Sequence, residues 1–193
     1  MKAVFLDRDG TINIEKHYLY KIEEFEFVTG VLEGLKLLQQ MGYSLVIVTN
    51  QSGIGRGYYS EDDFLKLNNW MLLSLEESGI HVEKVYYCPH LPDAKIEEYR
   101  VECNCRKPAL GMYEEAIREF DIDLSQSFAV GDKLRDCSIC ESTACRGFLI
   151  GSNEKEEIIQ QVKQKQIERV EYAADLYECA VRIQELRKLE EKQ

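Results

Sequence analysis

The sequence predicts an α/β protein built on a doubly wound, mainly parallel sheet. Short apolar runs that contain β-branched or aromatic residues alternate along the chain with segments whose apolar residues recur at helical spacing. This alternation is typical of strands joined by helices that cover both faces of a parallel sheet. Several apolar runs also end in acidic or small polar residues. Because ligands bind at the carboxyl ends of strands in such a sheet, these endings predict one shared site.

The first predicted strand leads into two closely spaced carboxylates. Ala3-Val4-Phe5-Leu6 is a short buried strand, and Asp7-Arg8-Asp9-Gly10-Thr11 follows it directly. A carboxylate can act as a covalent nucleophile, and a second one two residues on can exchange protons with a leaving group and with water. Both would repel an anionic substrate, and a hard cation such as Mg²⁺ would offset that repulsion. The alternative to a catalytic site is a polar turn after the strand that happens to be acidic.

The remaining elements follow from periodicity and from helix-start signals. Residues 12 to 29 show no clean period and predict a loop over the strand mouth. Ser60 and Asp63 form a capping-box pattern that predicts a helix start. The other predicted strands are 44–48, 82–87, 128–130 and 148–150, and the predicted helices are 31 to about 42, 60–79, 112–120 and 176–187.

Two more strand ends carry polar residues suited to the same site. Thr49-Asn50-Gln51-Ser52-Gly53 offers hydroxyl and backbone donors for phosphate oxygens, which makes Asn50, Gln51 and Ser52 candidate substrate-binding residues. Gly131-Asp132-Lys133 ends the strand at 128–130, with Asp136 beyond it. Ordinary polar turns are the alternative, and they become less attractive because the pattern recurs at several strand ends.

Composition limits the class of protein. The chain has 193 residues, of which 45% are hydrophobic, so we expect one folded domain over 1–193. The net charge of −11 argues against binding to nucleic acid or to a membrane. No apolar run is long enough to cross a bilayer, and no secretory signal opens the chain. The seven cysteines fit a reduced, cytoplasmic setting. We also expect a monomer.

Two close pairs of metal-binding residue types predict a zinc loop over 88–105. Cys88-Pro89-His90 supplies a thiol and an imidazole, and Cys103-Asn104-Cys105 supplies two more thiols. Three sulfurs and one nitrogen fit a closed tetrahedral Zn²⁺ site, which is structural because no position remains for water. Two unrelated thiol pairs are the alternative.

The zinc loop leads straight into Arg106-Lys107-Pro108. Arg suits a bidentate grip on phosphate, and Lys suits a point charge near a nucleophile. A solvated basic pair is the alternative. The remaining thiols at 137, 140 and 145 are predicted to be small buried core residues, in preference to a second metal or redox site.

These motifs together resemble the haloacid dehalogenase superfamily, and within it the branch of histidinol-phosphate and heptose-bisphosphate phosphatases. The sequences beginning at Phe5, Thr49, Arg106 and Gly131 are similar to the four superfamily motifs, and the stretch 88–105 is similar to the zinc loop of this branch. Gly111-Met112 is more like the heptose-bisphosphate enzymes. The resemblance therefore implies a Rossmann-like fold and Mg²⁺-dependent hydrolysis of the 7-phosphate of a heptose 1,7-bisphosphate.

The resemblance also implies roles for individual residues. Asp7 would form an aspartyl-phosphate, and Asp9 would protonate the sugar oxygen and later activate water. Mg²⁺ would be held by the carboxylates of Asp7 and Asp132 and by the backbone carbonyl of Asp9. Thr49 and Lys107 would stabilise the transferring phosphoryl group. Substrate recognition would fall to Arg106, with Lys133 and the loop carrying Glu15 and Tyr18 nearby.

The spacing of the motifs and the net charge limit the possible architectures and functions. The stretches from Asp7 to Thr49 and from Thr49 to Lys107 are filled by predicted elements, so no cap domain is expected. A histidinol-phosphate phosphatase, or a phosphatase of another small sugar phosphate, is the alternative enzyme. A polynucleotide 3′-phosphatase conflicts with the net charge of −11 and the lack of a basic stripe. A catalytically silent zinc-bearing interaction domain conflicts with the presence of both aspartates, Lys107 and Asp132.

Overall fold

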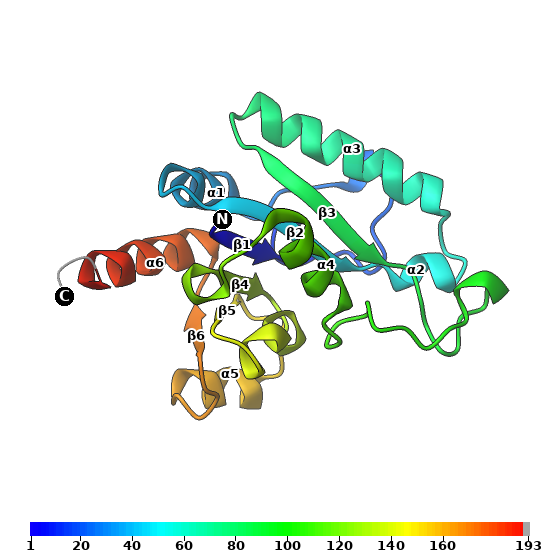
Figure 1. Ribbon diagram of the computed structural model, residues 1–193. Coiled ribbons are helices and arrows are strands. Elements are labelled where there is room, and N and C mark those ends of the chain that lie inside the picture. Colours follow the sequence, from blue (N-terminus) through cyan, green and yellow to red (C-terminus); the bar gives the residue numbers. More distant parts are fainter. Residues whose placement is uncertain (191–193) are drawn as a thin grey trace.

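The sheet has six parallel strands in the order β3-β2-β1-β4-β5-β6 (Figure 1). The computed structural model describes residues 1–190. The strands are β1 Ala3–Leu6, β2 Ser44–Asn50, β3 Val82–Cys88, β4 Phe128–Gly131, β5 Arg146–Ile150 and β6 Val170–Ala173. The α-helices are α1 Val31–Gln40, α2 Ser52–Gly55, α3 Glu61–Glu77, α4 Gly111–Phe120, α5 Glu156–Lys163 and α6 Leu176–Glu190. Short 3₁₀ segments cover Ile22–Glu24, Glu97–Tyr99, Leu124–Gln126 and Leu134–Glu141.

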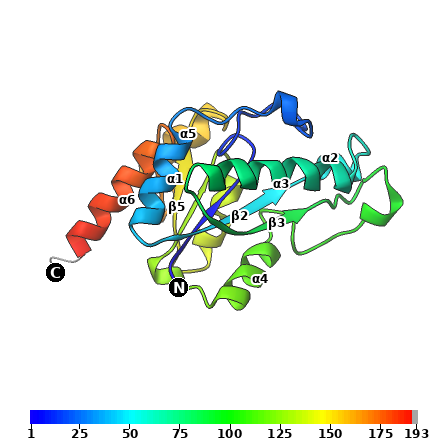
Figure 2. The same cartoon turned by 90° about the horizontal axis from the view of Figure 1, so that it is seen from above.

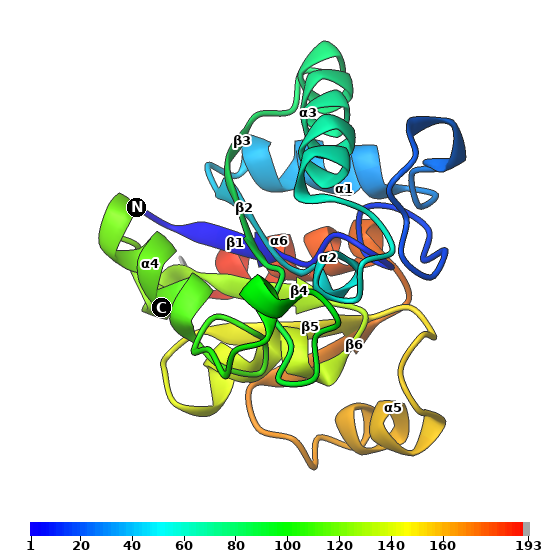
Figure 3. The same ribbon diagram turned by 90° about the vertical axis from the view of Figure 1, so that its right-hand side faces the viewer.

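Alternation along the central strands gives the sheet two apolar faces. Val4 and Leu6 of β1 pack into the core under α1, α3 and α6, whereas Ala3 and Phe5 pack into the core under α4 and α5. Figure 3 shows α1 and α3 on one side of the sheet and α4 and α5 on the other. Both faces of the strands are therefore covered, which explains why the strands read as continuous apolar runs.

Close approach of α1 and α6 depends on a glycine. The two helices pack side by side (Figure 2), and a Cβ added at Gly34 would lie 2.9 Å from the backbone of Leu176. A larger residue at this position would push the helices apart. The terminal helix predicted from apolar spacing is thereby part of the main core.

The predicted fold class is confirmed, and several boundaries move. The capping box at Ser60 and Asp63 is present, and the cysteines at 137, 140 and 145 are buried. Three elements escaped prediction: α2, α5 and the edge strand β6. Within 1–190, the stretch from Asp7 to Thr49 holds a loop, a 3₁₀ turn, α1 and β2, and the stretch on to Lys107 holds α2, α3, β3 and the 88–105 loop. No cap domain is inserted there. Residues 191–193 of the predicted 1–193 domain lie outside the described part.

Register places the predicted site residues at one edge. Leu6 of β1 pairs with Ile47 of β2 on one side and with Val130 of β4 on the other. The residues that follow these three positions therefore emerge together at the carboxyl ends of the central strands. No helix within 1–190 has both the length and the apolar character needed to span a membrane.

Candidate active site

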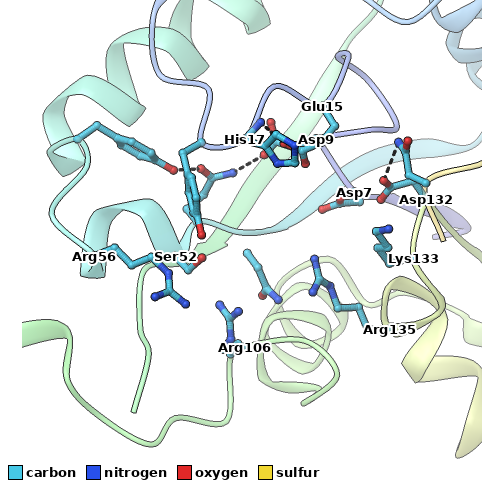
Figure 4. A pocket seen from close by; sticks show the side chains of 15 residues that line it. Asp7, Asp9, Glu15, His17, Ser52, Arg56, Arg106, Asp132, Lys133 and Arg135 are labelled. Carbon is cyan, nitrogen blue, oxygen red and sulfur yellow. Dashed lines mark hydrogen bonds between the residues drawn. The ribbon is translucent and has the colours of Figure 1, made fainter. Parts of the chain in front are cut away.

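A cavity of about 520 Å³ opens at the carboxyl ends of β1, β2 and β4. Its lining includes ten residues predicted from the sequence: Asp7, Asp9, Glu15, Tyr18, Asn50, Gln51, Ser52, Arg106, Asp132 and Lys133. Thr49 and Lys107 lie buried beneath it, at 1% and 2% exposure. Five lining residues were not predicted, namely His17, Arg56, Tyr59, Arg135 and Asn153. Acidic residues occupy one wall and the labelled arginines the opposite wall (Figure 4).

Asp7 is held by a buried ammonium. The Lys107 Nζ lies 2.8 Å from Asp7 Oδ1, 2.7 Å from Asp136 Oδ1 and 2.6 Å from the carbonyl oxygen of Val48. The contacts with Asp7 and Val48 are hydrogen bonds, and the contact with Asp136 is an ion pair. Lys107 therefore orients the Asp7 carboxylate and lowers the cost of its charge. The sequence motifs assign no role to Asp136, and its spacing of four residues from Asp132 is the only signal in the sequence for its part in the site.

Three carboxylates lie close together, and Lys107 pairs with two of them, Asp7 and Asp136. Oxygen atoms of Asp7, Asp132 and Asp136 all lie within 4.8 Å of one another. Burial raises the pKa of Asp7 to about 7, against the opposing effect of Lys107, and burial raises the pKa of Asp132 to about 6. Asn153 Nδ2 donates to Asp132 Oδ2 at 3.0 Å. The cluster thus carries more negative charge than its neighbours offset, which is the environment of a divalent cation with oxygen ligands.

Gly10 lets the first and fourth motifs approach each other. Its φ is +84°, and a Cβ built on it would lie 2.1 Å from Asp132 Oδ2. Both the backbone conformation and the lack of space require glycine here. The glycine after the paired aspartates is therefore explained by the neighbouring strand.

Asp9 lies in a partly buried polar network formed by Arg8, Asn13 and Gln51. The Arg8 guanidinium donates to both Asp9 oxygens at 2.9 Å, Asn13 Nδ2 donates at 3.0 Å and Gln51 Nε2 donates at 2.9 Å. Burial by itself would raise the pKa of Asp9, but Arg8 and these hydrogen bonds outweigh it and lower the pKa. Asp9 is therefore held as a carboxylate in this arrangement.

Thr49 is connected to the same network through Gln51. Gln51 Nε2 also donates to Thr49 Oγ1 at 2.9 Å, and Tyr59 donates to Gln51 Oε1 at 2.7 Å. The Thr49 oxygen already accepts a hydrogen bond, so its own proton is available to another acceptor in the site.

The four predicted zinc ligands converge at the end of β3. His90 Nδ1 lies 3.3 Å from Cys105 Sγ and 3.7 Å from Cys88 Sγ, and Cys88 Sγ lies 3.6 Å from Cys103 Sγ. All four ligand atoms lie within 4.8 Å of one another. Ligands bonded to one tetrahedral Zn²⁺ would be separated by about 3.3–3.8 Å. Cys105 Sγ lies 3.1 Å from Cys88 Sγ, slightly below this range. The donor set and its convergence therefore fit zinc, with this one pair of sulfurs closer than in a metal-bound site.

The fold and this site define a phosphatase of the haloacid dehalogenase type. A family model described as "Polynucleotide kinase 3 phosphatase" matches residues 2–138, and one described as "HAD-hyrolase-like" matches residues 104–179. The D-glycero-beta-D-manno-heptose-1,7-bisphosphate 7-phosphatase of Photorhabdus laumondii is 54% identical over 134 residues, which are 69% of this chain and 71% of that protein. The enzyme of the same name from Haemophilus ducreyi is 51% identical over 146 residues, or 75% and 80% of the two chains.

A solved structure agrees over nearly the whole chain. The D,D-heptose 1,7-bisphosphate phosphatase from B. bronchiseptica, complexed with magnesium and phosphate, is 30% identical, with a TM-score of 0.81, and the match covers 96% of this chain and 99% of that one. This chain belongs to the D-glycero-beta-D-manno-heptose-1,7-bisphosphate 7-phosphatase family of the haloacid dehalogenase superfamily.

Proposed function

We propose that this chain removes the 7-phosphate of D-glycero-β-D-manno-heptose 1,7-bisphosphate through an aspartyl-phosphate on Asp7. The observation that carries the proposal is the buried Lys107 ammonium, which holds the Asp7 carboxylate at the mouth of the cavity. Relatives about 50% identical are named for this substrate and for this anomer. The match to the Photorhabdus laumondii enzyme covers 71% of that enzyme's length.

The reaction would proceed in two displacements. Asp7 attacks phosphorus, and the bond between phosphorus and the C7 oxygen breaks. Asp9, rotated out of its network and protonated, gives its proton to that oxygen. It then takes a proton from the water that attacks the aspartyl-phosphate, which restores Asp7 and releases inorganic phosphate. The Thr49 hydroxyl would donate its proton to a phosphoryl oxygen.

The acidic cluster fits a magnesium ion. Mg²⁺ would be held by the carboxylates of Asp7 and Asp132 and by the Asp9 carbonyl, and it would offset the negative charge shared by the carboxylates and the substrate phosphate. Asp136 is already paired with Lys107. We also propose that Cys88, His90, Cys103 and Cys105 hold a structural Zn²⁺ that shapes the loop before Arg106.

The cationic wall supports a substrate with a second anionic group. Arg56, Arg106, Lys133 and Arg135 line the cavity away from Asp9. Burial, together with the guanidinium groups of Arg135 and Arg56, lowers the pKa of Arg106, so a bound anion would relieve this repulsion. We propose that Arg106 receives the phosphate on C1. Histidinol phosphate would place its ammonium against these cations, which disfavours the alternative substrate.

Product analysis tests the proposal. With Mg²⁺, the wild-type chain should release one phosphate from the heptose bisphosphate, and ³¹P NMR should show that the anomeric phosphate remains. Histidinol phosphate and a DNA 3′-phosphate should be poor substrates, which separates the proposed small sugar substrate from the other two. Asp7→Asn should remain folded, as judged by circular dichroism, and release phosphate at the background rate. Release from C1, or an active Asp7→Asn variant, would contradict the proposal.

A further inference from the structure

We infer that Asn50 is a positioning residue that fixes the backbone of Lys107. Asn50, the last residue of β2, receives the Lys107 N–H on its Oδ1 at 3.0 Å and donates from its Nδ2 to the Lys107 carbonyl at 3.0 Å. One side-chain amide thus pairs with both backbone polar groups of one residue. The inference rests on the proposed function, because it concerns the same site, and it assigns Asn50 to the protein's own machinery instead of to the substrate.

Lys107 needs an external partner of this kind. It lies in the irregular segment between the zinc loop and α4, where no helix or strand pairs its backbone. Buried backbone groups without partners are costly, and the Lys107 side chain is long and has many rotamers. The Lys107 ammonium contacts three oxygens, and these contacts would be lost if the Lys107 backbone shifted by a small part of the side chain's length. The Asn50 amide satisfies the backbone and limits such movement.

The same strand holds Lys107 at both ends. The Val48 carbonyl accepts a hydrogen bond from the Lys107 ammonium at 2.6 Å, and the Asn50 side-chain amide makes two hydrogen bonds with the Lys107 backbone. Since Val48 and Asn50 are two residues apart in β2, the separation between these two anchor points is set by a rigid strand. The clamp is made without any of the four proposed zinc ligands. β2 therefore positions the ammonium against Asp7 independently of the zinc loop.

Kinetics of Asn50 variants separate positioning from substrate contact. We expect Asn50→Ala to lower kcat about 10- to 100-fold, the scale of loss for a displacement of about 1 Å at a catalytic group, with KM changed less than about threefold. The same loss should appear with p-nitrophenyl phosphate, which has no sugar or second phosphate to contact. Asn50→Asp keeps the acceptor for the Lys107 N–H but sets a carboxylate oxygen against the Lys107 carbonyl oxygen, so we expect a loss of kcat at least as large as that of Asn50→Ala.

A matched control exists elsewhere in the fold. Gln39 makes the same kind of double pairing far from the cavity, since its Nε2 donates to the Gly79 carbonyl at 2.9 Å and its Oε1 accepts from His81 N–H at 2.7 Å. Gln39→Ala should destabilise the protein comparably and leave kcat unchanged. Zinc content by metal analysis should be the same in wild type, Asn50→Ala and Gln39→Ala. If Asn50→Ala does not fold, Asn50→Asp and Asn50→Ser take its place.

Two outcomes would overturn the inference. A rise in KM for the heptose bisphosphate with unchanged kcat, and no effect on p-nitrophenyl phosphate, would make Asn50 a substrate contact. Unchanged kinetics with a loss of stability like that of Gln39→Ala would make it a structural residue only. Failure of the proposed function would look different, because the wild-type chain would then be inactive on the heptose bisphosphate while the Asn50 comparison could still be made on p-nitrophenyl phosphate.

Discussion

Replacing Arg8 with methionine should unfold the protein at a much lower urea concentration. Arg8 is fully buried, contacts both Asp9 oxygens and lies 5.4 Å from the centre of the Phe64 ring. Arg8→Met keeps most of the apolar length but leaves Asp9 with only neutral donors. Removing one partner of a buried ion pair costs about 3–5 kcal/mol, and we expect the lower end because the Asp9 side chain is 17% exposed. With a urea dependence of about 2 kcal/mol/M, the midpoint should fall by roughly 1.5 M.

Fluorescence of the single tryptophan gives the assay and a control. Trp70 packs on Phe25, with ring centroids 5.2 Å apart, so its emission reports the core. Lys16→Met removes an exposed ion pair with Glu26 and should cost less than about 1 kcal/mol. The penalty of Arg8→Met should also shrink in an Asp9→Asn background, where no carboxylate needs a cation. A midpoint shift no larger than that of Lys16→Met would refute the reasoning.

Three further predictions follow from the charges around the cavity and from the thiol cluster. Wild-type protein should carry ~1 Zn²⁺ per chain, and Cys103→Ser should lower the zinc content and, through Arg106, kcat/KM for the heptose bisphosphate, as metal analysis and kinetics would show. Burial raises the pKa of Asp7 to about 7 and that of Asp132 to about 6, whereas both are 3.8 in the unfolded chain. Between pH 3.8 and these higher values, the folded chain therefore binds more protons than the unfolded chain. The free energy of unfolding of Mg²⁺-free protein should therefore fall as the pH rises from about 4 to about 7, and urea titrations should show a flatter dependence for Asp7→Asn. Arg106→Ala should lower kcat/KM for the heptose bisphosphate roughly 10- to 150-fold, and for a heptose 7-monophosphate much less; equal losses would assign Arg106 to the reacting phosphate.

The fold could be predicted because its central strands are buried on both faces. Such strands appear as apolar runs, and their carboxyl ends appear as abrupt polar residues such as Asp7, Thr49 and Asp132. The edge strand β6, Val170–Ala173, has only four residues and includes Glu171, so it shows neither a run nor a clear alternation. Its pairing with β5 depends on tertiary contacts, which the local sequence does not indicate.

The site was predictable where residue type alone limits the chemistry. Paired thiols and an imidazole have few other uses, and their ligand atoms do converge. Arg8 shows the opposite case, since an arginine between two aspartates suggests solvent until the Phe64 ring and Gln51 enclose it. Asn50 was predicted as a substrate contact because its loop is polar, and only the position of the Lys107 backbone reveals its two hydrogen bonds. Interactions between distant segments are invisible when each segment is read separately.

The contact between Gly10 and Asp132 has a consequence for how relatives of this chain could diverge. The two positions are far apart in the sequence but share one small volume, so substitutions at them should not be independent. A lineage that exchanged Asp132 for a small residue would remove the main steric reason for glycine at position 10. The Asn153 amide, 2.9 Å from an added Cβ, and the positive φ would remain, and asparagine also tolerates such a φ. Loss of the acid at position 132 together with asparagine at position 10 would therefore identify a relative that lacks the phosphatase activity but retains the backbone turn at position 10.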